Sequence, residues 1–252
     1  MQHNYVLTVA YDGSHYMGWQ KTSTGKSIEG ELEKALTTLL QHPIQLQAAS
    51  RTDRGVHAHG QVVNFFTEKK LDCSTLHRRI QRLLPDDIVI LLAEEKPLQF
   101  HPTIDTIGKE YHYHIANVPV ILPRYRFTHW HIREPLDLDL MKKALLLFEG
   151  THDFKAFCNF RKGLSYPTTE RTIFKAHLSE ELPGFLRIEI YGDHFLYKMA
   201  RNLIGTAVYV GLKKIALSEL QKIIESKKRA NAGITAPALG LVLHHVFYPS
   251  AR

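Results

Sequence analysis

One short stretch of the sequence combines the residue types that a carboxylate nucleophile needs. Asp53 lies between Arg51 and Arg54, and Gly55 follows directly. Nearby positive charge favours the ionised form of a carboxyl group, so Asp53 could be placed in a pocket and keep its charge. Gly55 predicts a sharp turn, because glycine takes positive φ at little cost. A surface turn with a local salt bridge is the alternative, and only the rest of the chain distinguishes the two.

Two residues in the second half of the chain are candidates for the same chemistry. Tyr111 lies on an expected strand, where its ring could stack on a base and its hydroxyl could assist a proton transfer. Ordinary packing of a half-buried strand tyrosine is the alternative. Arg201 lies in an apolar helix expected over 195–211, where arginine is rare unless it is paired. Its partner could be Asp53 or a structural acid, or the side chain could face solvent.

The longest irregular stretch, residues 119–135, alternates basic and aromatic residues. Arg124 and Arg126 lie among Tyr125 and Phe127. This mixture is suited to RNA, because arginines contact phosphates and aromatic rings stack on bases. A loop packed by its own aromatic residues is the alternative interpretation.

Other kinds of site find less support in the sequence. The His-x-His pairs 57/59, 112/114 and 129/131 could supply metal ligands from a strand, but no third-ligand motif accompanies them. We therefore expect structural or RNA-facing histidines and no metal. The Gly-Lys-Ser sequence at 25–27 lacks the earlier glycine of a phosphate-binding loop, and no Gly-x-Ser-x-Gly elbow is present.

Composition predicts a folded protein with a polyanionic partner. The 252 residues are 44% hydrophobic and 23% charged, enough for one large domain or two modest ones with a packed core. The net charge of +7 favours binding to phosphates. Cys73 and Cys158 are far apart and form no Cys-x-x-Cys pair, so we expect no disulfide scaffold. No signal peptide or membrane span is visible, which predicts a cytoplasmic protein.

The expected elements mix strands and helices without a regular strand-helix-strand order. This mixture predicts an α+β fold with a largely antiparallel sheet. Strands are expected at 5–11, 44–51, 61–66, 88–93, 111–115, 172–178, 185–191 and 241–247. Helices are expected at 28–41, where Ser27 is the cap, at 74–84, where Ser74 is the cap, and at 139–149, 195–211 and 218–229.

Taken in order, these segments resemble the TruA family of tRNA pseudouridine synthases. The similarity extends over nearly the whole chain, and the SRTDRGVHA and MARNLIG segments are its most specific parts. The matching motifs are YDGSHYMGWQ (11–20), SRTDRGVHAHGQVVNF (50–65), LPDDI (84–88), KEYHYHI (109–115), HDFKAFC (152–158), FLYKMARNLIGT (195–206) and TAPALGLVLHHVFY (235–248).

The resemblance implies a reaction and a role for each candidate residue. Uridine would be isomerised to pseudouridine in the anticodon stem-loop of tRNA, at positions 38 to 40. Asp53 would be the catalytic carboxylate, attacking C1′ or taking a proton from C2′. Tyr111 would stack on the target uracil and help the proton leave C5. Arg51 and Arg201 would lie near Asp53, with Arg201 as its ion-pair partner.

The resemblance also implies an architecture and a set of partners. The fold would consist of two similar α+β halves, with helices on one face of the sheet and the active cleft between the halves. Residues 1–104 would carry the Asp53 loop, and residues 105–252 would carry Tyr111 and the Arg201 helix. The protein would be a homodimer that binds tRNA and needs no metal or organic cofactor.

At two positions the sequence departs from the family pattern, and both concern the contacts expected to bind RNA. Arg54 stands where many members have a small residue, and Thr103 stands where many have arginine. Arg54 thus joins Arg124 and Arg126 as a candidate RNA contact. The competing hypotheses are a non-catalytic RNA-binding or tRNA-folding protein on the same scaffold, and a metal-dependent nuclease that uses the histidine pairs.

Overall fold

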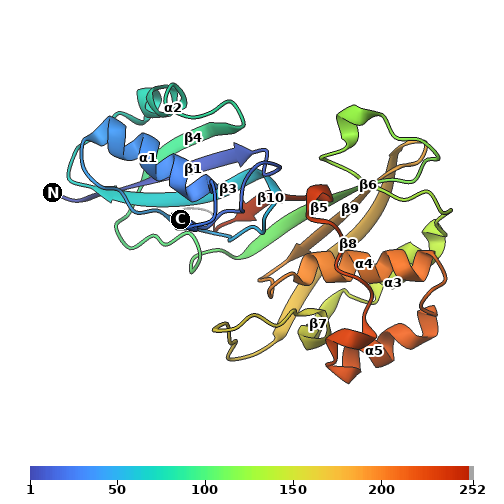
Figure 1. Ribbon diagram of the computed structural model, residues 1–252. Coiled ribbons are helices and arrows are strands. Elements are labelled where there is room, and N and C mark those ends of the chain that lie inside the picture. Colours follow the sequence, from blue (N-terminus) through green and yellow to red (C-terminus); the bar gives the residue numbers. More distant parts are fainter. Residues whose placement is uncertain (250–252) are drawn as a thin grey trace. The chain divides into compact units, whose positions relative to one another are not determined.

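The computed structural model describes residues 1–249, which form two compact units (Figure 1). The first unit contains residues 1–107 and the last strand from Val242, and the second contains residues 108–241. The boundary expected from the sequence, between 104 and 105, leaves that last strand in the second half. The structure groups it with the first unit, where Val242 and Leu243 of β10 (Leu241–Phe247) pair in parallel with β3 (His57–Thr67).

The sheet of the first unit is mainly antiparallel. Its central strand is β1 (His3–Tyr11), which pairs with β3 on one side and with β4 (Ile88–Lys96) on the other. A two-residue strand, β2 (Gln47–Ala48), adds to β3 just before the Asp53 loop. The expected strand at 44–51 is therefore much shorter in the structure, and its last residues, 49–51, belong to the loop instead.

Two helices complete the first unit. In α1 (Ile28–Leu40), the side chain of Ser27 accepts a hydrogen bond from the Gly30 N–H, which confirms the predicted cap. In α2 (Cys73–Gln81), the cap is Asp72 instead of the expected Ser74, because the Asp72 carboxylate accepts from the Ser74 N–H. The helix α1 crosses the face of the sheet (Figure 1) and buries its apolar residues Ile28, Leu32, Leu36 and Leu40.

The second unit is built on four antiparallel strands. Their order is β5 (Gly108–Ala116), β9 (Phe185–Gly192), β8 (Glu170–Leu182) and β7 (Gly150–Asp153). A short strand, β6 (Trp130–His131), pairs in parallel with β5. The longer helices are α3 (Leu138–Leu146), α4 (Met199–Gly211) and α5 (Leu220–Ser226). Single 3-10 turns are η1 (Pro123–Tyr125), η2 (Phe154–Phe157), η3 (Leu217–Glu219), η4 (Arg229–Asn231) and η5 (Ala238–Gly240).

The start of α4 and the end of α5 differ from the expected boundaries for the same physical reason. The helix expected from 195 begins only at Met199, because Lys198 has a left-handed backbone with φ of 61°. The helix expected to reach 229 ends at Ser226, because Lys227 has φ of 55°. Residues 195–198 therefore form a bent approach to α4, and this approach contributes to the site.

These elements confirm the α+β class with largely antiparallel strands. Cys73 and Cys158 are both free thiols, as expected. Within residues 1–249, no helix has the length and apolar character needed to cross a membrane.

Candidate active site

The loop that carries Asp53 spans residues 49–56, between β2 and β3. Its first residues are fixed to β3 by backbone and side-chain hydrogen bonds. The Ala49 N–H donates to the carbonyl of Val62 at 2.8 Å. The buried side chain of Gln61 accepts from the Ser50 N–H at 3.2 Å and donates to the Ser50 carbonyl at 2.7 Å. The two residues at the start of the Asp53 loop are thus held against β3 by hydrogen bonds.

The turn itself has the form that the sequence predicts. The carbonyl of Asp53 accepts from the Val56 N–H at 3.1 Å, and Gly55 has φ of 77°. Asp53 is half-buried, whereas Arg51 and Arg54 are both exposed. Asp53 is therefore partly accessible to solvent, and an exposed arginine lies on each side of it in the sequence.

The segment 11–20 packs against this turn through backbone atoms. The Trp19 N–H donates to the carbonyl of Thr52 at 3.0 Å, and the hydroxyls of Tyr11 and Thr52 lie 2.7 Å apart. Gly18 has φ of 99°, and a Cβ there would lie 2.7 Å from the same carbonyl. Only glycine at position 18 lets the two backbone segments come this close. The Asp53 turn is therefore held in part by main-chain contacts with segment 11–20.

A second glycine of this segment makes an even closer approach. A Cβ on Gly13 would lie 2.0 Å from the carbonyl oxygen of Val56. The Gly13 N–H donates to Nδ1 of the buried His57 at 3.2 Å. His57 therefore has a structural contact at the start of β3, in agreement with the expectation for this histidine.

Tyr111 lies in the middle of β5 and is nearly buried, with 8% of its surface exposed. Its ring meets the ring of Phe195 edge to face, with centroids 4.9 Å apart and planes at 75°. Phe195 belongs to the bent approach to α4, and the sequence prediction missed it because that residue was assigned to the helix itself. A base that stacks on Tyr111 would thus meet a ring whose orientation is already fixed.

Arg201 lies in the first turn of α4 and is half-buried. Its Nε donates to the carbonyl of Ala236 at 2.7 Å, while the Ala236 N–H donates to the Arg201 carbonyl at 3.1 Å. The next carbonyl, of Pro237, accepts from the hydroxyl of Tyr113 at 2.8 Å. Burial raises the pKa of Tyr113 well above its usual value, partly offset by the charge of Arg201. These contacts orient the guanidinium group of Arg201 on the face of β5 that carries Tyr111 and Tyr113.

A buried polar network holds the segment that binds Arg201. The side chain of Asn202, fully buried, donates to the Phe157 carbonyl at 2.6 Å and to Oδ1 of Asn159 at 2.7 Å. Its oxygen accepts from Arg229 at 2.9 Å and from the Thr235 hydroxyl at 2.7 Å. Burial lowers the pKa of Arg229. The network ties residues 229–235 to α4, and this fixes the carbonyl of residue 236.

Gly205 permits the close packing of α4 on the same segment. A Cβ at this position would lie 1.8 Å from the carbonyl oxygen of Ile234. The glycine of the MARNLIG motif is thus required by packing, because any side chain would push the helix away from residues 234–236.

The two arginines of the expected RNA-binding loop are exposed, and each lies over the aromatic residue that follows it. Arg124 is 4.7 Å from the centroid of the Tyr125 ring, and Arg126 is 4.2 Å from that of Phe127. The loop is thus packed by its own aromatic residues and also presents two cations to solvent. The structure shows the aromatic packing of the alternative interpretation, and the RNA contacts of Arg124 and Arg126 stay a prediction.

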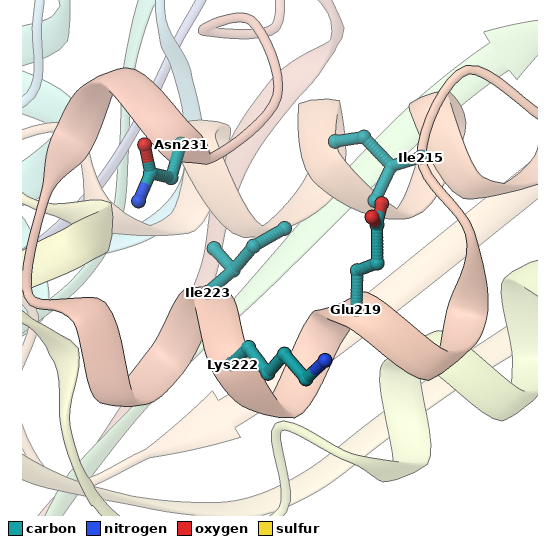
Figure 2. Close-up of a pocket in the computed structure, with 5 residues that line it drawn as sticks. All are labelled: Ile215, Glu219, Lys222, Ile223 and Asn231. Carbon is teal, nitrogen blue, oxygen red and sulfur yellow. The ribbon is translucent and has the colours of Figure 1, made fainter.

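A pocket of about 310 Å³ lies elsewhere in the second unit, at η3, α5 and η4 (Figure 2). Its lining residues are Ile215, Glu219, Lys222, Ile223 and Asn231. None of the residues predicted for chemistry or RNA binding lines this pocket. Its charged residues, Glu219 of η3 and Lys222 of α5, are both exposed, and we do not assign this pocket to the reaction.

Comparisons with known proteins agree with the motifs. A family model described as tRNA pseudouridine synthase matches residues 7–105 and 144–249. The chain is 47% identical over 246 residues to tRNA pseudouridine synthase A 2 of Protochlamydia amoebophila (strain UWE25), covering 97% of this chain and 94% of the relative. It is 42% identical over 247 residues to tRNA pseudouridine synthase A of Acetivibrio thermocellus, covering 97% and 99%.

Among solved structures, the chain aligns with one from a Cbf5-Nop10-Gar1 complex at 14% identity and a TM-score of 0.35. This alignment covers 82% of this chain and 44% of the other, and a similarity this low supports no argument.

The contact between segment 11–20 and the Asp53 turn can be tested with Gly18→Ala. The substitution adds a Cβ within 2.7 Å of a backbone oxygen and forces a positive φ on alanine, so we expect a loss of about 2–4 kcal/mol in the free energy of unfolding. Gly163→Ala is the matched control, because Gly163 has φ of 78° and open space around it. Urea unfolding should show a clearly smaller loss for the control. Equal losses would mean that backbone strain alone, and no close contact, accounts for Gly18.

The network behind Arg201 can be tested with Asn202→Ala. The change leaves several buried groups without a partner, so we expect a loss of about 2 kcal/mol or more in the free energy of unfolding. Gln221→Ala, at an exposed position of α5, should change it by less than about 0.5 kcal/mol. Similar values for the two variants would contradict the structural role of Asn202.

Proposed function

Because this chain belongs to the family of tRNA pseudouridine synthases, we propose that it isomerises uridine to pseudouridine in the anticodon stem-loop of tRNA, at positions 38 to 40. The single observation that carries the proposal is the rigid 49–56 turn, which holds one half-buried carboxylate between two exposed arginines.

The proposed reaction breaks the N1–C1′ bond of uridine, rotates the base and joins C5 to C1′. C5 loses its proton and N1 gains one, so the atoms of substrate and product balance. Asp53 acts as the nucleophile at C1′: its oxygen bonds to C1′ as N1 of uracil leaves, and this ester bond breaks when C5 attacks C1′. Removal of a C2′ proton by the same carboxylate is the other route. Substrate and product are isomers, so the reaction involves no oxidation and we propose no metal or organic cofactor. Arg51 and Arg201 supply positive charge that offsets the cost of an anion once RNA displaces water.

Tyr111 supports the target base in this proposal. A uridine must leave its stack to react, which costs a few kcal/mol. Stacking on an aromatic ring returns about 1–3 kcal/mol. The contact with Phe195 fixes the Tyr111 ring before the base arrives, so little freedom is lost on binding.

Basic surface residues complete the proposed interaction with tRNA. Arg54, Arg124 and Arg126 are exposed and suited to phosphate contacts. The net charge of +7 supports a polyanionic partner. We also propose that the protein acts as a homodimer, on the strength of the family resemblance alone.

A non-catalytic RNA-binding protein remains the competing function. It is less well supported, because a carboxylate facing phosphates weakens binding and serves no purpose in a protein that only binds. The two functions differ in one observable outcome, the formation of product.

Asp53→Asn should lower pseudouridine formation on an unmodified tRNA transcript by about 1,000-fold or more, because the amide is no nucleophile. Affinity for the transcript should stay within a few-fold of wild type. Asp139→Asn, at an exposed position of α3, is the control and should retain full activity. Appreciable turnover by Asp53→Asn would contradict the assigned role of Asp53.

Tyr111→Phe and Tyr111→Leu separate the two roles proposed for this side chain. Tyr111→Phe keeps the ring contact with Phe195 and removes only the hydroxyl, so kcat should fall while KM changes little. Tyr111→Leu also removes the stacking surface, so it should lose affinity for the base as well. Unchanged kcat in Tyr111→Phe would show that the hydroxyl takes no part in proton transfer.

A further inference from the structure

One lysine of β5 is buried without a partner. Only 7% of the surface of Lys109 is exposed. Within residues 1–249, its ammonium group makes no hydrogen bond or ion pair. Lysine is rarely buried to this extent unless it is paired, because taking a charge out of water is costly. Burial lowers the pKa of Lys109 to about 8.

Strand geometry places Lys109 beside Tyr111. Alternate residues of a strand point to the same face, so Lys109 and Tyr111 share one face of β5 at a spacing of about 7 Å. The register partner of Lys109 on β9 is Gly192, which has no side chain to cover it. A Cβ at Gly192 would lie 3.3 Å from the ring of Phe195, the residue that packs on Tyr111.

The charged groups around Lys109 do not neutralise it. Burial lowers the pKa of His194, just after β9, and the nearby charge of Lys109 lowers it further, while Asp193 acts in the opposite direction. Arg171 of β8 acts on His194 in the same direction as Lys109. The carboxylate of Asp193 accepts from the Thr172 and His194 N–H groups.

On β5 itself, the adjacent acid faces away from Lys109. Glu110 points to the opposite face of the strand, where its carboxylate lies 2.9 Å from His112. The Lys109 side of Tyr111 therefore carries an excess of positive charge in the free protein.

We propose that Lys109 binds a phosphate of the target nucleotide, next to the base that stacks on Tyr111. The proposal rests on the proposed function, because it needs an RNA substrate at this face. A backbone phosphate supplies the anion that Lys109 lacks among residues 1–249. A nucleotide joins base and phosphate at a distance similar to the spacing of the two side chains. Lys109 is thus a binding residue for the reacting nucleotide itself, whereas Arg54, Arg124 and Arg126 contact RNA from the surface.

The test combines a binding measurement with a stability measurement on the full chain. Lys109→Met should weaken binding of an unmodified tRNA transcript by about five-fold or more and lower the slope of log K against log salt by about one. The same variant should be more resistant to urea than wild type, because it removes an unpaired buried charge. Packing alone does not produce opposite changes in affinity and stability.

The stability difference should also depend on pH. The Lys109 pKa of about 8 in the folded protein lies below its ordinary value of 10.5, so the unfolded chain binds more protons between these values. Stability of the wild type should therefore rise relative to Lys109→Met as the pH increases from about 8 to 10.5. Below pH 8, the advantage of the variant should be complete and constant.

Two further variants serve as controls. Lys109→Arg keeps a cation at this position and should keep most of the salt dependence. Lys175→Met removes an exposed lysine of β8 that pairs with Glu189 at 3.1 Å, and its register partner Tyr191 faces away from the Tyr111 side. Lys175→Met should not show both the higher stability in urea and the weaker tRNA binding that we expect for Lys109→Met.

The possible results separate this inference from the proposed function. If the wild type forms pseudouridine and Lys109→Met binds tRNA with unchanged affinity and salt slope, the role of Lys109 is wrong and the function stands. A Lys109→Met protein that fails to fold, or that loses stability and affinity together, also overturns the inference. A wild type that binds tRNA without forming product contradicts the function, while the comparison of affinities still tests Lys109.

Discussion

The position of Asp53 depends on a close contact between two backbone segments. The turn at 49–56 has no regular secondary structure of its own, and a loop of this kind would ordinarily be mobile. It is held instead by Gln61 at its base and by the 11–20 segment at its tip, where Gly13 and Gly18 bring main chain against main chain. The loop that carries the carboxylate is therefore fixed by contacts at its base and at its tip, as the proposed role of Asp53 requires.

In the second unit, a close contact between backbone segments likewise positions Arg201. Gly205 lets α4 approach residues 234–236, and the network around Asn202 fixes that segment from behind. The Ala236 carbonyl then orients the guanidinium plane. Lys109 differs from these residues because no acidic group within residues 1–249 pairs with its charge. A protein that retains such a charge loses stability, and a ligand that supplies the missing anion recovers it as binding free energy.

Much of this could be predicted from the sequence, and the rest depends on long-range contacts. The α+β class, the Ser27 cap and the Gly55 turn follow from local rules, and the family assignment follows from the motifs. The start of α4 was predicted too early, because apolar periodicity continues through residues 195–198 while the left-handed Lys198 ends the helix. The roles of Phe195 and Asn202 depend on partners far away in the chain, and single-sequence patterns do not show such pairings. The lack of an acidic partner for Lys109 could not be predicted for the same reason, since only the fold shows which of the described side chains lie around it.

The central claim is that this protein converts specific uridines of tRNA. The most direct test is to incubate the wild-type protein with unmodified tRNA transcripts and to map pseudouridine at single-nucleotide resolution. The account predicts pseudouridine at positions 38, 39 or 40, wherever uridine occupies them, and none elsewhere in the molecule. Tight, salt-sensitive binding without product, or product confined to another region of the tRNA, would contradict it.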